Sequence, residues 1–188
     1  MTIAMTESKI VHDGWARFLV ARFKRDDGVT LSREIEDHGA AVAVLPFDPH
    51  RRLALLVSQF RAPVFYAQRQ DHLMEAIAGL LESDAPAQCA AREAYEEAGV
   101  RLRELEHVGT CWTMPGLSTE RMFLYLAPYT EADRIGAGGG LPHEHEDIAV
   151  REIPLQDLAA MADRGAIADM KTLLLVQTLR LRRPDLFG

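Results

Sequence analysis

The sequence lacks features that would point to several common classes of protein. It has only two cysteines among 188 residues, Cys89 and Cys111, and they are not in CxxC spacing. We expect both thiols to stay reduced and to have no functional role. No apolar run approaches the roughly 18 residues that a membrane helix needs, and the opening MTIAMTESKIVHDG lacks the basic and apolar blocks of a signal peptide. These absences predict a cytoplasmic protein with no membrane partner.

An excess of positive charge is also missing. The formal net charge is −7 and the isoelectric point is near 5.5, so the chain carries no overall footprint for nucleic acid, although a local basic pocket could still hold a phosphate. We therefore expect a small-molecule partner. With 48% hydrophobic and 26% charged residues, the composition suits one globular domain with a substantial core, plus a small appendage.

Hydrophobic patterning predicts a sheet with an N-terminal extension. Apolar and polar residues alternate in WARFLVARFKR and TLSREIED, which are separated by Asp26-Asp27-Gly28 and predict a half-exposed hairpin. We assign residues 1–38 to this antiparallel extension, which we expect to dimerise, and residues 39–188 to the main domain. The main domain opens with AAVAVLPF and RLALLVSQF, two nearly continuous apolar segments typical of buried strands.

Helices and strands interleave along the rest of the chain, after a polar segment, FYAQRQD. We expect helices at about 86–98, 155–164 and 169–182, and strands at about 104–111, 121–127 and 149–153. Proline near the start and glycine after the end mark the helix 86–98 clearly. The predicted fold class is α/β, a mixed sheet covered by helices. Large aromatic residues such as Phe47, Phe60 and Trp112 are expected in the core.

The helix 86–98 carries an unusual concentration of negative charge. At 100° per residue Glu93 and Glu97 lie one above the other, and Glu96 lies beside them. Like charges at this spacing repel by roughly 0.2–0.5 kcal/mol per pair, and Arg92 could hold Glu96 through an ion pair four residues apart. One interpretation is a solvated helix face. The other is a site for Mg²⁺ or Mn²⁺, which bind carboxylates together with substrate phosphates.

A second acidic segment, HEHED at residues 143–147, follows the glycine-rich GAGGG. Taken alone it is typical of a solvated loop. A zinc site built from His143 and His145 is disfavoured, because no further His or Cys cluster completes four ligands.

The segment GLLESDAPAQCAAREAYEEAGV, from Gly79 to Val100, resembles the Nudix box. The second half of that pattern is intact. It reads Arg-Glu, an aliphatic residue, any residue, Glu-Glu, any residue and Gly. The first half departs from it, since the loop is one residue shorter and either Asp84 takes the position of the first glutamate or that position is lost. The resemblance extends from about Val29 to Leu181, and Pro115 matches a proline of the branch that cleaves nucleoside diphosphate sugars.

The resemblance implies the Nudix fold, a mixed sheet between helices, and a set of metal ligands. The backbone carbonyl of Ala78 and the side chains of Glu93, Glu96 and Glu97 would hold two or three Mg²⁺ ions, with Mn²⁺ as an alternative. Arg92 would orient these carboxylates, and Glu97 would also act in catalysis.

Four further residues have roles that the resemblance implies. Glu144 matches the proposed catalytic base and Glu146 a further metal ligand. Arg61, otherwise a surface charge, would contact the substrate phosphates with its planar guanidinium. Glu75 would lie near substrate and metals, whereas its plain interpretation is an exposed strand position.

The resemblance also implies a metal-dependent pyrophosphohydrolase acting on a nucleotide sugar. The short loop, Ala94 and the GAGGG run are similar to the GDP-mannose enzymes, and ADP-ribose is the alternative substrate. A nucleotide-sensing domain without activity is less favoured because the carboxylates are kept. A triphosphate hydrolase is less favoured because of Pro115 and the N-terminal hairpin. A homodimer is expected, because the branch commonly pairs through exchanged N-terminal segments.

Overall fold

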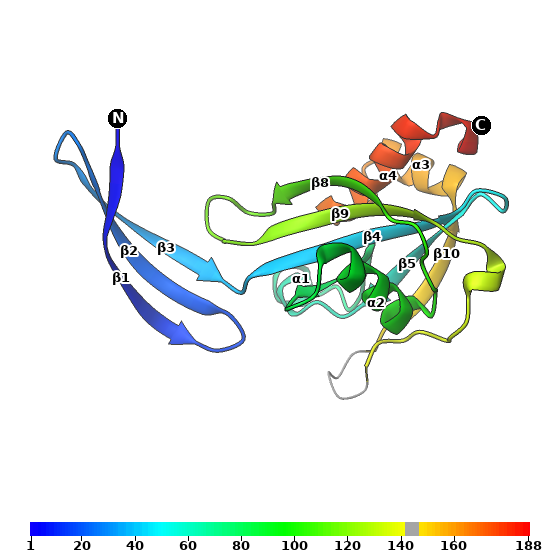
Figure 1. Ribbon diagram of the computed structural model, residues 1–188, viewed down its shortest axis with the longest axis horizontal. Coiled ribbons are helices and arrows are strands. Elements are labelled where there is room, and N and C mark those ends of the chain that lie inside the picture. The colour runs from blue at the N-terminus through cyan, green and yellow to red at the C-terminus, as the bar shows by residue number, and fades with distance from the viewer. Residues whose placement is uncertain (142–146) are drawn as a thin grey trace. The chain divides into compact units, whose positions relative to one another are not determined.

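The computed structural model describes residues 1–141 and 147–188 (Figure 1). The chain divides into two compact units. One comprises Met1–Ala40 and Cys111–Met122, and the other comprises Ala41–Thr110 and Phe123–Gly188. No helix among the residues described is both long enough and apolar enough to cross a membrane.

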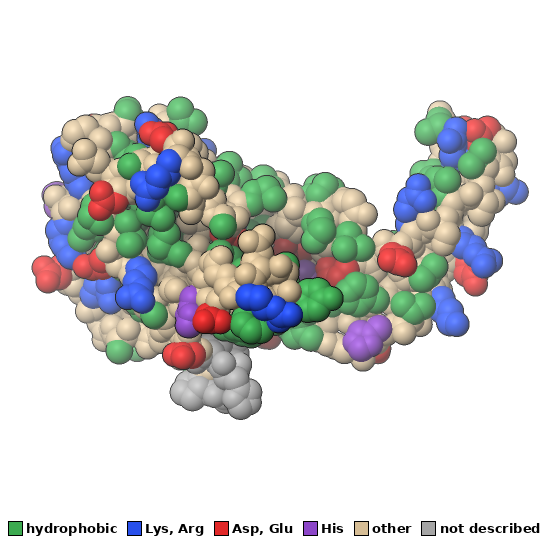
Figure 2. All heavy atoms as spheres, turned by 180° about the vertical axis from the view of Figure 1, so that it is seen from behind, with side chains coloured by type: hydrophobic (Ala, Val, Ile, Leu, Met, Phe, Trp, Pro, Cys, Tyr) green, Lys and Arg blue, Asp and Glu red, His purple; other side chains and the backbone are tan. Residues whose placement is uncertain are grey.

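The first unit is built on a three-stranded antiparallel sheet in the order β1, β2, β3. Its strands are β1 (Ile3–Asp13), β2 (Arg17–Arg25) and β3 (Thr30–Asp37). β2 and β3 form the hairpin expected around Asp26-Asp27-Gly28. β1 was not predicted, because its apolar residues do not alternate regularly and two register shifts interrupt its pairing. Every residue of β1 is exposed, and Figure 2 shows apolar side chains at the surface of this sheet.

The second sheet has the strand order β10, β5, β4, β9, β8, with β6 paired to β5 and β7 paired to β4. The bounds of its strands are β4 (Ala40–Asp48), β5 (Leu53–Gln59), β6 (Leu73–Glu75), β7 (Ile77–Leu81), β8 (Glu106–Trp112), β9 (Arg121–Pro128) and β10 (Ala149–Pro154). The helices are α1 (Ala62–Gln68), α2 (Pro86–Ala98), α3 (Leu155–Asp163) and α4 (Met170–Arg182), with short 3₁₀ turns η1 (Glu131–Asp133) and η3 (Pro184–Leu186).

Helices cover this sheet, as the sequence predicts (Figure 1), and the apolar side chains of β4 and β5 are almost all buried. On one side, α2 contributes small residues to a core formed with β4, β5 and β7, namely Cys89, Ala90, Ala94 and Ala98 against Val42, Val44, Leu55, Val57 and Ile77. α3 and α4 bury Leu155, Leu158, Leu175 and Leu179 completely. The small residues of α2 allow close approach to the strands, which sets the distance between its acidic face and β7.

Helix α1 is the main departure from the predicted elements. It covers part of the segment FYAQRQD, which was described only as polar. The helix has a proline in its first turn and ends at Arg69, whose φ is +57°. None of its residues is buried, so the helix has no apolar stripe from which the sequence could have indicated it.

An imidazole between two carboxylates joins β3 to the segment 111–122 within the first unit. His38 Nδ1 lies 2.5 Å from Glu36 Oε1, and Nε2 lies 3.2 Å from Glu120 Oε1. The ring of His38 stacks on Trp15 with 4.9 Å between centroids. Burial opposes the charged form, but hydrogen bonds to the two glutamates more than offset it, so the pKa of His38 lies above its ordinary 6.5.

This raised pKa predicts that the contact weakens with increasing pH. The stabilisation is complete below the unfolded pKa of 6.5 and is lost as pH rises through the higher folded value. The backbone bonds from Glu36 to Leu117 and from Thr119 to Glu36 report on this contact. Hydrogen exchange at these amides, corrected for intrinsic rates between about pH 5 and 8, should show easier opening at high pH. His38→Gln should remove the pH dependence, and an identical profile in wild type and variant would contradict the prediction.

Candidate active site

The acidic helix α2 places its charges on one side and its small residues on the other. It begins at Pro86 and ends before Gly99, whose φ of +65° is favourable only for residues such as glycine. The amide of Gly99 donates to the carbonyl of Tyr95 at 2.9 Å. Because Ala90, Ala94 and Ala98 face the sheet, the neighbouring glutamates lie at the edge of the core.

Arg92 is the centre of the ionic contacts on this helix. Its guanidinium lies 2.8 Å from Glu96, 2.9 Å from Glu93 and 3.5 Å from Asp84. Burial works against the charge, but the two glutamates more than offset this and raise the pKa of Arg92. The expected pairing of Arg92 with Glu96 is present, and Glu93 is held as well. Asp84, in the shortened loop, is thus a third acidic neighbour of the guanidinium.

Two glutamates of α2 lie against the backbone of β7. Glu97 is only 2% exposed, and the amide of Ala78 donates to its Oε2 at 3.4 Å. Glu93 packs so closely on Gly79 that a Cβ at that residue would lie 2.1 Å from the Glu93 carboxyl carbon. Gly79 is therefore required for close approach of a carboxylate, in addition to any role in turning the chain.

The residues beside Ala78 and Gly79 fit a hard divalent cation bound jointly with a substrate. They offer carboxylate oxygens on one helix, packed against strand backbone that Glu93 can approach because Gly79 has no side chain. Within 1–141 and 147–188, no group of three or more His, Cys, Asp or Glu side chains is arranged to hold a metal ion, and Arg92 pairs with Glu93 and Glu96. Mg²⁺ commonly uses one or two carboxylates and completes its coordination with water and phosphate oxygens.

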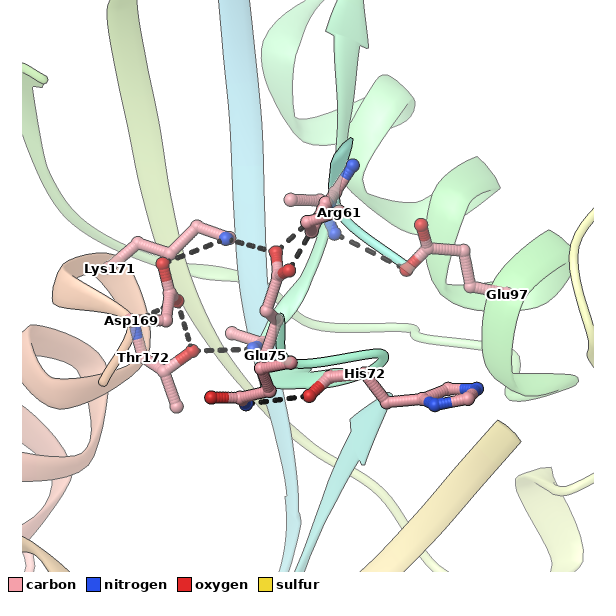
Figure 3. Close-up of polar contacts among 10 residues, drawn as sticks. Arg61, His72, Glu75, Glu97, Asp169, Lys171 and Thr172 are labelled. Carbon is pink, nitrogen blue, oxygen red and sulfur yellow. Dashed lines mark hydrogen bonds and ion pairs between the residues drawn. The ribbon is translucent and has the colours of Figure 1, made fainter. Parts of the chain in front are cut away.

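A buried ionic cluster lies beside this helix (Figure 3). Glu75, at the end of β6, is 2% exposed and accepts two hydrogen bonds from Arg61, from Nε at 2.8 Å and from Nη2 at 3.0 Å. Lys171 Nζ lies 2.6 Å from Glu75 Oε2. Burial would raise the pKa of Glu75, but Arg61 and Lys171 more than offset it, and the pKa lies below its ordinary 4.5. Glu75 is thus a buried anion, and the exposed strand position considered for it is wrong.

Some functional candidates were missed from the sequence, and some expectations were wrong. Lys171 was not identified from the sequence, because a lone lysine before an apolar helix has no signal that separates it from a surface charge. Phe47 is buried as expected, but Phe60 and Trp112 are 54% and 55% exposed. Phe60 directly follows β5, and Trp112 is the last residue of β8. Glu144 and Glu146 lie outside the described residues.

The fold and these contacts define an α/β protein with a carboxylate-bearing helix packed on a glycine-containing strand. Residues 37–175 match the NUDIX domain. A GDP-mannose pyrophosphatase from Cronobacter sakazakii is 36% identical over 187 residues, covering 97% of each chain. One from Pectobacterium atrosepticum is 34% identical over 187 residues, covering 96% of this chain and 95% of the relative.

A solved structure described as an ADP compounds hydrolase has the same fold. Its TM-score is 0.78 with 14% sequence identity, and the match covers 98% of this chain and 96% of that chain. The chain belongs to the NUDIX domain family. Hydrolases of this family generally depend on divalent metal, which agrees with the oxygen ligands offered by α2 and β7.

The contact between Gly79 and Glu93 predicts a selective loss of metal affinity. In Gly79→Ala the new methyl group displaces the Glu93 carboxylate, and Mn²⁺ affinity measured by calorimetry should fall by about 10–100-fold, as for other losses of ligand support. Gly109→Ala is the matched control, because a Cβ there meets no atom within 4 Å. Unchanged Mn²⁺ binding in a folded Gly79→Ala variant would show that this approach is not part of the metal site.

Proposed function

We propose that the protein is a divalent-metal-dependent pyrophosphohydrolase of nucleoside diphosphate sugars, with GDP-mannose as substrate and GMP and mannose 1-phosphate as products. The observation that carries the proposal is the packing of the α2 carboxylates on Ala78 and Gly79. Beside them lies Arg61, which is paired with the buried Glu75. Relatives named GDP-mannose pyrophosphatase, which cover nearly the whole chain, support the choice of substrate.

In this proposal Arg61 binds the diphosphate. Two of its five N–H donors go to Glu75, and its side chain is still 39% exposed. The fork geometry of a guanidinium suits paired phosphate oxygens. Because Glu75 is buried and holds Arg61 by two bonds, the arginine meets the substrate already oriented, which lowers the entropy cost of binding.

The metal-binding role falls to the α2 helix and to β7. Glu93, Glu96, Glu97 and the carbonyl of Ala78 are the proposed ligands for two or three Mg²⁺ ions, with Mn²⁺ as a substitute, and Glu146 is the proposed additional ligand. When bound, such ions draw electron density from the diphosphate oxygens and stabilise the leaving phosphate.

The protein side chains organise the remaining chemistry. Arg92 holds Glu93 and Glu96 and reduces their mutual repulsion. Glu144 is the proposed general base that takes a proton from water as its oxygen attacks one phosphorus. The bond from that phosphorus to the bridging oxygen breaks, which yields the nucleoside monophosphate and the sugar phosphate.

The choice between GDP-mannose and ADP-ribose depends on contacts outside this machinery. Arg61 and the metal ligands grip the diphosphate that both substrates share, and such uniform contacts cannot discriminate between them. We therefore expect kcat/KM to be higher for GDP-mannose because of the base and sugar contacts. ADP-ribose remains the alternative substrate, since it needs the same ligands and the same arginine.

A panel assay tests the proposed function. Release of monophosphate from GDP-mannose, ADP-ribose and other nucleotide sugars should require Mg²⁺ and should stop on chelation. Glu97→Gln should lower kcat by roughly 100-fold or more, because metal-assisted charge stabilisation is worth several kcal/mol. Glu104→Gln, at an exposed position, is the control and should behave as wild type. Full activity in EDTA refutes the metal chemistry, and a clear preference for ADP-ribose changes only the substrate.

We further propose that the protein is a homodimer formed through its N-terminal sheet. β1 is an edge strand whose apolar side chains Ile3, Met5, Ile10 and Val11 are 46–60% exposed, and unpaired edges of this kind favour strand pairing or burial against a partner. Light scattering at micromolar concentration should give twice the monomer mass of 21.0 kDa. Ile10→Lys should shift the protein toward monomer, whereas Lys9→Glu, at a neighbouring position that faces the other side of the strand, should not. A monomeric wild type would refute this proposal.

A further inference from the structure

The first turn of α4 is connected to both the side chain of Glu75 and the backbone beside it (Figure 3). Asp169 caps the helix by accepting a hydrogen bond from the amide of Thr172 at 2.9 Å. Its other carboxylate oxygen lies 3.1 Å from Lys171 Nζ. A single carboxylate thus holds two neighbouring residues, and each of them contacts a different part of the Glu75–Ala76 dipeptide.

One connection runs through Thr172 to the backbone. Thr172 is completely buried, its hydroxyl donates to Asp169, and the same oxygen accepts from the amide of Ala76 at 2.6 Å. Ala76 is the residue that separates β6 from β7. The hydroxyl therefore satisfies an amide at the interruption between the two strands and locates Glu75 relative to α4.

The other connection runs through Lys171 to the carboxylate of Glu75. Oε2 of Glu75 accepts from both Lys171 Nζ at 2.6 Å and Arg61 Nη2 at 3.0 Å. Lys171 is 13% exposed in its side chain, so its charge is little screened by water. Two cations thus share one carboxylate oxygen in a buried site.

Asp169 limits the pull of Lys171 on this shared oxygen, because it holds the same ammonium group. Arg61, Lys171, Glu75 and Asp169 carry two positive and two negative charges, and the lysine charge is shared between Glu75 and Asp169. Without the Asp169 charge, Lys171 would bind Glu75 more strongly and draw Oε2 away from the arginine fork. Bidentate pairing requires both carboxylate oxygens to face the guanidinium, so the orientation of Arg61 depends on Asp169.

We propose that Asp169 is a positioning residue for the substrate-binding Arg61, acting through Lys171 and Glu75. This inference rests on the proposed function, in which Arg61 binds the diphosphate. Asp169 does not touch substrate in this scheme. Its negative charge sets the geometry with which the arginine meets the phosphate oxygens.

A double-mutant cycle tests the proposal. Asp169→Asn removes the charge but retains a good helix cap, and Arg61→Ala removes the group that Asp169 is proposed to orient. Alone, Asp169→Asn should raise KM for GDP-mannose by about tenfold, within the range for coupled contacting residues, and change kcat much less. In the Arg61→Ala background the same substitution should change KM less than twofold. Arg61→Lys, which keeps a charge beside Glu75, is a second background in case Arg61→Ala does not fold.

The matched control is Asp163→Asn. Like Asp169, Asp163 pairs with a cationic side chain of α4, because its carboxylate lies 2.6 Å from Arg180 Nη1. This pair is exposed and is separate from the cluster. Asp163→Asn should leave KM unchanged in every background. If Asp169 had a merely structural role, Asp169→Asn would raise KM by the same factor whether or not Arg61 is present. Equal fold-increases in KM in the wild-type and arginine-substituted backgrounds would therefore overturn the proposal.

The dissociation constant Kd of a methylene-bridged, non-cleavable analogue of GDP-mannose is measured for the same set of variants. If wild type binds the analogue but cleaves no nucleotide sugar, the proposed function fails, and the cycle on Kd still decides whether Asp169 acts through Arg61. If wild type cleaves GDP-mannose but the effects of the two substitutions multiply, only the positioning role fails. Absence of both binding and cleavage in wild type overturns both proposals.

Discussion

A buried carboxylate determines much of how this site is built. Glu75 is removed from water, and an ionised group in such a place is costly unless it is paired and hydrogen-bonded. Arg61 directly precedes α1 and Lys171 lies in the first turn of α4, so neutralising Glu75 brings together segments far apart in the sequence. The positive charges of Arg61 and Lys171 offset the negative charge of Glu75 where water cannot. That arrangement presents an arginine beside the acidic helix.

The helix α2 shows a second constraint, which is one of space. Its alanines bring it close to the strands, and Gly79 leaves room for the carboxylate of Glu93 against β7. A larger residue at either place would move the carboxylates away from the backbone. Arg92 then limits repulsion among charges that the packing has forced together. Close packing therefore brings the glutamates against β7, and ion pairing with Arg92 stabilises them there.

Much of this arrangement was predictable from local pattern. The bounds of α2 follow from Pro86 and Gly99, and its acidic face follows from the helical period, so the position of Arg92 beside Glu96 could be predicted as well. The buried strands β4 and β5 were evident from their continuous apolar residues. The strand β1 and the helix α1 were not, because both are exposed along their lengths and neither has the hydrophobic period that burial imposes.

The sequence by itself determined the family, the α/β class and the helix that carries the clustered glutamates, because these depend on residues near one another in the chain. Only the tertiary structure decided that Glu75 is buried, that Lys171 and Asp169 share its charge balance, and that Phe60 and Trp112 lie exposed at strand ends. Burial and ion pairing depend on which distant segments meet in space. Only the packed fold shows which charges lose their contact with water, and a charge that is buried in this way must be paired to be stable.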